Sequence, residues 1–193
     1  MGLERQRLLA AAQGFCDAFK DMADIDEILL FFASSDDSSV IEYGEPALAP
    51  FLGRRFIGAP GIRMYFETVQ AVLSYGNLQF SDFVVDVETK KVGLKGSGTF
   101  QWKSTGESWD ESFAYILSFD DGCRITEYQV WADSGSAYLA RIGKLNEVRV
   151  RNQIFRSLGG VLIRTDSGQR LCDFQKRGKS RCDSYMAMSR CSQ

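Results

Sequence analysis

Histidine is absent from the sequence, and this absence excludes more chemistry than any other feature of the composition. Without histidine there is no Ser-His-Asp or Cys-His nucleophile system and no imidazole to act as a general base near neutral pH. Five cysteines are present, but none forms a Cys-x-x-Cys pair, so a zinc site would need an unusual set of ligands. We therefore expect no metal and no cofactor.

Long apolar runs are also missing. No run approaches the roughly 20 residues that a membrane-spanning helix needs. The N-terminal stretch has apolar residues at helical spacing rather than the continuous apolar core of a signal peptide. These two observations predict a soluble, intracellular protein, and we expect it in the cytoplasm.

The distribution of charge divides the chain. Residues 1–143 contain 12 Lys and Arg against 21 Asp and Glu, whereas residues 144–193 contain 11 against 4 and few aromatic residues. This contrast predicts one domain over residues 1–143 and a basic, poorly ordered extension over residues 144–193. Two alternatives stay open for the extension: nucleic-acid binding, which we disfavour because aromatic residues are not interleaved with the basic ones, and a segment that was never selected as protein.

Hydrophobic periodicity predicts the order of elements. Apolar residues at three- and four-residue steps indicate helices over residues 4–22, 25–32 and 60–73, with a loop over residues 44–58. Alternating residues and turn signals indicate strands over residues 40–43, 77–87, 90–103, 107–119 and 123–132, followed by a short helix. A slip in the alternation at Ser81–Asp82 indicates a β-bulge. The layout is α+β, with helices on one face of a curved antiparallel sheet.

A resemblance to a known family rests on this layout and on the stretch GTFQWKSTGESWDESFAYILSFDDGCRITEYQVWADSGSAYLA. Over residues 5–142 the chain resembles the SnoaL-like branch of the NTF2-like superfamily. The resemblance implies a cone in which a curved antiparallel sheet wraps around N-terminal helices and encloses a pocket. It does not specify the function, because this fold carries isomerases, cyclases, dehydratases and non-catalytic binding modules.

The resemblance also implies where catalytic groups would stand. Ketosteroid isomerases of the superfamily use a tyrosine on the first helix, an aspartate base on the first strand and a protonated aspartate on a late strand. By element and spacing these positions fall on Phe15, Tyr43 and Tyr115. The base carboxylate and one donor are therefore missing, and the histidine of SnoaL-type cyclases and scytalone-type dehydratases is missing too.

Strand alternation selects the residues that we expect to face the pocket. If Tyr115 points inward, Glu111 and Phe113 do as well, whereas Glu42 beside the base position has the opposite parity and is expected to be exposed. The candidate catalytic residues are Tyr115, Tyr43 and Glu111. The candidate ligand-binding residues are Phe15, Phe19, Tyr65, Phe66, Val69, Phe100, Trp102, Phe113, Tyr128 and Val130. The alternative for these rings is a solid core.

Taken together, these patterns predict a pocket lined by aromatic residues and tyrosines that binds a small hydrophobic metabolite. The resemblance implies isomerisation, cyclisation or dehydration of a polyketide- or terpenoid-like compound of secondary metabolism, by an isomerase or lyase without histidine or metal. The sequence leaves open whether the protein catalyses, and the alternative is a non-catalytic NTF2-like module that binds a ligand or partner. Trp131 has the parity of the outer sheet face, and we expect a homodimer through that face.

Overall fold

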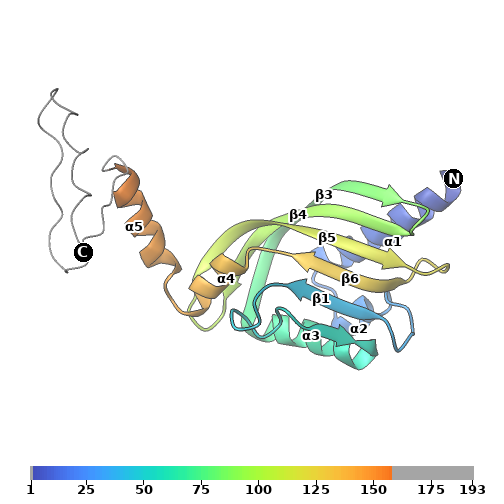
Figure 1. Ribbon diagram of the computed structural model, residues 1–193, viewed down its shortest axis with the longest axis horizontal. Helices are drawn as coiled ribbons and strands as arrows, with labels where there is room; N and C mark the ends of the chain where they lie inside the picture. Colours follow the sequence, from blue (N-terminus) through green and yellow to red (C-terminus); the bar gives the residue numbers. More distant parts are fainter. Residues whose placement is uncertain (1, 158–193) are drawn as a thin grey trace, which may run out of the picture.

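The computed structural model describes residues 2–157, in which helices cover one face of a curved sheet (Figure 1). The helices are α1 (Gly2–Lys20), α2 (Ile25–Leu29), α3 (Gly58–Val72), α4 (Ser134–Arg141) and α5 (Leu145–Ser157). The strands are β1 (Ser39–Tyr43), β2 (Arg55–Ile57), β3 (Leu73–Asp86), β4 (Lys91–Trp102), β5 (Ser108–Phe119) and β6 (Ile125–Trp131). The predicted order of elements is therefore confirmed, with β2 as an additional strand inside the expected loop.

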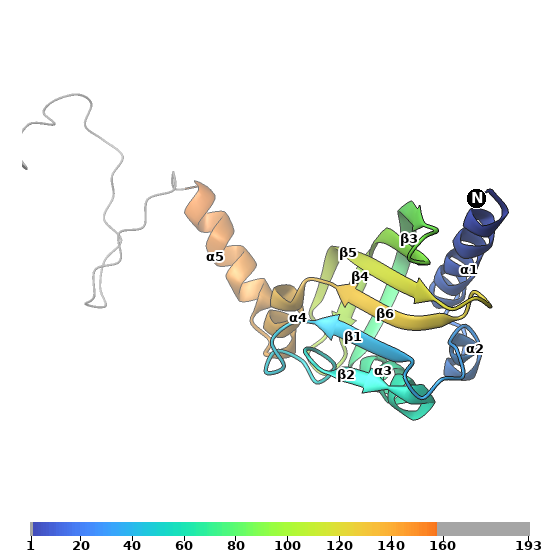
Figure 2. The ribbon, with the colours of Figure 1, turned by 45° about the vertical axis from the view of Figure 1, so that its right-hand side comes forward.

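The six strands form one sheet in the order β2-β1-β6-β5-β4-β3. All neighbours are antiparallel except β1 and β6, which run parallel, so the sheet is mixed rather than purely antiparallel. The parallel pair arises because the chain crosses from β1 to the far edge through α3 and returns by the β3–β6 meander (Figure 2). This return sets the first strand directly against the last.

Two irregularities bend the long edge strand β3. The β3–β4 register shifts between Gly76 and Gln79 and again between Ser81 and Val84. Asn77 and Asp82 both adopt positive φ at these places. Extra residues of this kind bend a strand and increase its twist, so the sheet curls over the helices. The second shift confirms the bulge predicted at Ser81–Asp82.

The core lies between the sheet and the helices. In α1 the residues at helical spacing, Leu8, Ala12 and Phe15, are buried. The Phe15 ring packs edge-on against Phe32 and Tyr128, with ring centroids 5.9 and 5.2 Å away. Such aromatic contacts add to the stabilisation that burial already supplies.

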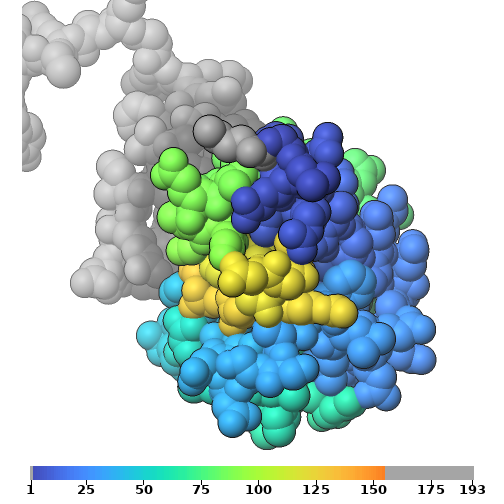
Figure 3. Space-filling model, turned by 90° about the vertical axis from the view of Figure 1, so that its right-hand side faces the viewer, coloured from blue at the N-terminus to red at the C-terminus, as the bar shows by residue number. Residues whose placement is uncertain are grey.

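One end of the molecule is closed by polar contacts between turns. Arg7 of α1 donates to the backbone carbonyl of Asp121 in the β5–β6 turn, and Lys90 of the β3–β4 turn forms an ion pair with the Asp121 carboxylate. Figure 3 shows α1, the β3–β4 turn and the β5–β6 turn gathered at this end. The interior cavity described below reaches the other end, where Ser134 and Ala137 of α4 line it.

Helix α5 begins at the carboxylate of Glu107. The two carboxylate oxygens of Glu107 accept the backbone N–H groups of Leu145, at 2.8 Å, and of Asn146, at 3.2 Å. A negative charge beside these unpaired N–H groups stabilises a helix start. The predicted extension thus begins as a helix over residues 145–157, and its remaining residues, 158–193, lie outside the described residues. Within residues 2–157 no helix combines the length and apolar character needed to cross a bilayer.

Candidate functional site

An interior cavity of about 50 Å³ lies between the inner sheet face, the helices α1, α3 and α4, and the segment before β2. Its wall contains the aromatic residues Phe19, Phe51, Tyr65, Tyr75, Phe100, Trp109, Phe113, Tyr115 and Tyr128. It also contains two glutamates, Glu42 and Glu111. A space of this size holds roughly three to five water molecules, so a larger ligand would enter only if side chains moved.

The strand register explains why Glu42 reaches this cavity. Residues directly opposite one another in neighbouring strands point to the same sheet face. Glu42 of β1 lies opposite Val130 of β6, and Val130 lies opposite Tyr115 of β5. These three residues therefore form one inward row, and Glu42 keeps only 8% of its surface exposed.

The only hydrogen-bond donor to the Glu42 carboxyl group among the described residues is the Tyr65 hydroxyl of α3, 2.7 Å from Oε2. Burial raises the pKa of Glu42 to about 7, the Tyr65 hydrogen bond lowers it, and the charge of Glu111 raises it. A carboxyl group with this pKa exchanges its proton near neutral pH, which is the property of an effective general acid or base.

Two further phenols complete the inner wall. The rings of Tyr115 and Tyr128 meet edge-on, with centroids 4.8 Å apart. Burial raises the pKa of both hydroxyl groups well above that of an exposed tyrosine. Both phenols therefore remain protonated near neutral pH. A hydrogen bond between them lowers the pKa of Tyr115 and raises that of Tyr128, so Tyr128 is the donor and the O–H of Tyr115 is left to donate elsewhere.

Glu111 is the second carboxyl group of the cavity. The indole Nε1–H of Trp109 donates to Glu111 Oε2 at 2.6 Å. Burial raises the pKa of Glu111, the Trp109 hydrogen bond lowers it, and the nearby charge of Asp133 raises it. The Asp133 carboxylate itself is engaged elsewhere, because it accepts the N–H and the hydroxyl of Ser136 at the start of α4. Glu111 thus faces the interior, as strand parity predicted.

Most of the residues selected from the sequence meet at this cavity. Those that line it are Phe19, Tyr65, Val69, Phe100, Glu111, Phe113, Tyr115, Tyr128 and Val130. Phe15, Phe66 and Trp102 are buried in the surrounding core without lining the cavity. Whether any of these residues binds a ligand stays a prediction.

The expected positions of Tyr43 and Glu42 were wrong, and the two are exchanged. Tyr43 is 37% exposed on the outer face, where its ring stacks on Trp131 with centroids 4.6 Å apart. Glu42, expected in solvent, is the residue inside. Strand alternation groups Val40 with Glu42 and Ile41 with Tyr43, but only the pairing with β6 shows which pair faces inward. Trp109 was also missed, although it shares the parity of Glu111.

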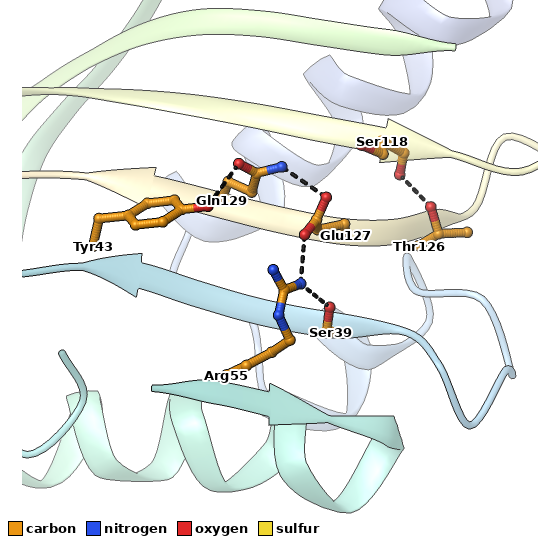
Figure 4. A network of polar contacts seen from close by, with 7 residues as sticks. All are labelled: Ser39, Tyr43, Arg55, Ser118, Thr126, Glu127 and Gln129. Atoms are coloured by element: carbon orange, nitrogen blue, oxygen red, sulfur yellow. Dashed lines mark hydrogen bonds and ion pairs between the residues drawn. The ribbon is translucent and has the colours of Figure 1, made fainter. Parts of the chain in front are cut away.

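The outer face of the same strands carries a different polar arrangement (Figure 4). Arg55 of β2 contacts the carboxylate of Glu127 at 2.5 Å and donates to the Ser39 hydroxyl. Gln129 donates to the same carboxylate and accepts from the Tyr43 hydroxyl. The charges of Arg55 and Glu127 compensate each other, whereas Glu42 has one hydroxyl donor and no basic residue among the described residues that line its cavity.

The cavity wall contains no Lys or Arg among its described residues. Within residues 2–157 no three Cys, Asp and Glu residues are grouped so that they could hold a metal ion. The polar groups of the wall are the carboxyls of Glu42 and Glu111, the carboxylate of Asp133 that Ser136 already holds, the Ser134 hydroxyl, several phenols and one indole N–H.

Comparison with known proteins identifies the fold. No protein-family model and no curated protein sequence matches the chain. An NTF2-like protein of unknown function from Burkholderia pseudomallei matches with a TM-score of 0.60 and 15% identity over 69% of this chain and 96% of its own. TerC, co-crystallised with polyporic acid, matches with a TM-score of 0.59 and 18% identity over 70% and 98%.

A candidate SnoaL-like polyketide cyclase from Mesorhizobium loti matches with a TM-score of 0.50 and 18% identity over 63% of this chain and 96% of its own. Other matching structures are named as candidate isomerases. These similarities confirm the α+β, NTF2-like and SnoaL-like fold of the described chain.

Proposed function

We propose that this NTF2-like chain binds a small, largely apolar molecule in the interior cavity and that Glu42 transfers a proton to or from it. The observation that carries the proposal is the burial of Glu42 at the cavity wall with Tyr65 as its donor. Because its pKa is near 7, both protonation states are populated at neutral pH. The deduced chemistry is the kind that isomerases, cyclases and dehydratases perform.

The other polar groups have supporting roles in this proposal. Tyr115, which accepts a hydrogen bond from Tyr128, donates to an oxygen that gains negative charge, and Glu111 is a second proton carrier. Matching structures named as isomerases and as a polyketide cyclase support this class of reaction. The proposal includes a polyketide- or terpenoid-like substrate of secondary metabolism, as expected from the sequence. It also includes a cytoplasmic location. Such a substrate needs partly exposed rings such as Tyr75 and Phe100 to move.

The test begins with mass spectrometry of small molecules that remain bound to the purified protein. The compound found is then incubated with the protein in D₂O, and deuterium incorporation or conversion is followed. Glu42→Gln is expected to keep the fold and to lose about 10²- to 10⁴-fold in rate, the usual contribution of a general acid or base. Tyr65→Phe removes the hydrogen bond that lowers the Glu42 pKa, so it is expected to shift the pH–rate profile to higher pH.

A molecule that binds but is neither converted nor exchanged would refute the catalytic half of the proposal. A wild-type rate in Glu42→Gln would assign the chemistry to another group. If the cavity retains nothing from any source, the binding half is refuted as well.

A second candidate function is a non-catalytic module that binds a ligand or partner as a homodimer through the outer sheet face. The exposed, stacked rings of Tyr43 and Trp131 favour it, because large exposed rings are enriched at protein interfaces. Sedimentation analysis tests it with Trp131→Glu, which should convert a dimer to a monomer. A wild-type protein that sediments as a monomer would contradict it.

A further inference from the structure

The ionisable side chains that line the cavity are all acidic: each is either neutral or negatively charged. Glu42 and Glu111 carry the carboxyls, and the remaining ionisable side chains in the wall are tyrosines, apart from Asp133, whose carboxylate is held by Ser136. No basic residue lines the cavity within the part of the chain that the structure describes. An anion that entered would meet negative charge and no compensating group, so burial of an anion here is unfavourable.

Each element packed around Glu42 contributes an acidic or neutral group. Tyr65 comes from α3, Tyr115 and Glu111 come from β5, and Tyr128 comes from β6. Burial is the main cause that raises the pKa of the three phenols and of Glu42; the charge of Glu42 raises the pKa of each phenol further, and that of Glu111 raises the pKa of Glu42. Tyr65 alone favours the ionised form of Glu42, through its hydrogen bond, and none of these groups carries a positive charge.

The hydrogen bond from Tyr65 occupies Oε2 of Glu42, and no described residue donates to Oε1. Glu42 is buried, with 8% of its surface exposed, and it lines the cavity. When Glu42 is ionised, no basic residue among the described residues of the cavity wall balances its charge, so a positively charged ligand would supply the missing counter-charge.

Aromatic rings surround this space. Phe113 and Tyr115 lie with centroids 4.9 Å apart, and Phe100 and Trp109 with centroids 5.9 Å apart. Ring faces attract cations, and aromatic walls are the usual recognition surface for alkylated ammonium groups. An alkylated ammonium also loses less hydration on burial than a compact primary ammonium, which is strongly hydrated.

We propose that the cavity selects a small molecule bearing an alkylated ammonium group, held between the carboxylates of Glu42 and Glu111 and the surrounding ring faces. This inference rests on the ligand-binding half of the proposed function and specifies the charge of the ligand. The cavity volume, equal to roughly three to five waters, suits a trimethylammonium headgroup of a few heavy atoms.

Isothermal titration of the full chain with three compounds of similar shape tests the inference. The first compound is choline. The second is the alcohol 3,3-dimethylbutan-1-ol, in which carbon replaces the nitrogen of choline, and the third is 3,3-dimethylbutanoate, an anion with the same branched end. Choline is expected to bind at least about tenfold more tightly than the alcohol because a desolvated cation gains from both the rings and the carboxylates. The anion is expected to show no binding.

The pH dependence provides a second readout. With a Glu42 pKa of about 7, the ionised fraction rises from about one tenth at about pH 6 to about nine tenths at about pH 8. Choline affinity should therefore rise about tenfold over this interval, because only the ionised state supplies the counter-charge. The affinity for the alcohol should not rise. Titrations in buffers of different ionisation enthalpy should show proton release from the protein when choline binds.

Glu42→Gln is expected to remove both the preference for choline and its pH dependence while the thermal unfolding transition remains cooperative. Glu111→Gln serves as the second variant; it should weaken choline several-fold and leave the alcohol unchanged. This variant and the wild-type pH profile decide the matter should Glu42→Gln fail to fold.

Equal affinity for choline and the alcohol would overturn the inference and leave the ligand-binding proposal standing. Absence of choline binding, or choline binding that is unchanged in Glu42→Gln, would overturn it too. The bound-molecule experiment above judges the proposed function independently of these outcomes.

Discussion

Glu42 and Glu127 lie on neighbouring strands, β1 and β6, but on opposite faces of the same sheet. Glu127 faces outward and contacts the guanidinium of Arg55 at 2.5 Å. Glu42 faces inward, where one phenol is its only described donor and burial raises its pKa to about 7. Charge compensation, and not residue type, therefore separates a structural carboxylate from a chemically responsive one.

The largest expected effect is the loss of stability when a tyrosine of the inner face is truncated, compared with a tyrosine of the outer face. Tyr128→Ala removes a ring that is 1% exposed and packs against Phe15 and Tyr115, and it should lower the free energy of unfolding by about 3–5 kcal/mol. Tyr43→Ala on the outer face removes a ring that is 37% exposed and should cost at most about 1 kcal/mol. Urea unfolding measures both. Equal losses would mean that the two faces do not differ in packing.

The next effect concerns Glu42 itself. Its folded pKa of about 7 lies above the ordinary value of 4.5, so the folded state binds more protons between these values and loses stability as pH rises through that window. Glu42→Gln should therefore match the wild type below about pH 4 and exceed it by ~3 kcal/mol above about pH 8. Unfolding curves at both pH values test this. A constant difference would show that burial does not shift the Glu42 pKa.

Two glycines of β4 offer a matched comparison of the faces. A Cβ on Gly96 would overlap the Phe113 ring, whereas a Cβ on Gly93 meets nothing within 4 Å. Gly96→Ala should destabilise the protein by about 1–3 kcal/mol through overpacking. Gly93→Ala should be neutral or slightly stabilising. Thermal unfolding of the two variants side by side checks the expectation, which would be contradicted by equal melting temperatures.

The smallest effect is expected for the outer carboxylate. Glu127→Gln breaks a partly exposed ion pair with Arg55 and should cost about 0.2–1 kcal/mol, less at high salt. Unlike Glu42→Gln, it should not stabilise the protein at high pH. Unfolding measured at low and high ionic strength distinguishes the two carboxylates, and a large, salt-independent loss would show that the outer network is as important as the inner one.

Much of the fold was predictable because it depends on local patterns. The apolar stripe of Leu8, Ala12 and Phe15 indicated α1, and the slip at Ser81–Asp82 indicated the bulge in β3. Alternation along β5 correctly placed Phe113 and Tyr115 inside. Strand β2 was not predicted, since three residues are too short for a periodic signal.

The candidate site was predictable only in part. Alternation relates Val40 to Glu42 and Ile41 to Tyr43, but with apolar residues in both pairs it does not tell which pair is buried. The match to the aspartate base position of ketosteroid isomerases selected Tyr43 for the interior. The parallel pairing of Glu42 with Val130 decided otherwise, and that pairing joins segments far apart in the chain.

The sequence by itself determined the order of the elements, the inward aromatic residues of β5 and the absence of imidazole chemistry, because each depends on composition or on neighbours a few residues apart. Only the tertiary structure decided that Glu42 is buried beside Tyr65, a residue 23 positions later, with Glu111 nearby. Burial and charge environment are sums over groups from several elements. The raised pKa of Glu42 therefore arises only once β1, α3 and β5 have packed together.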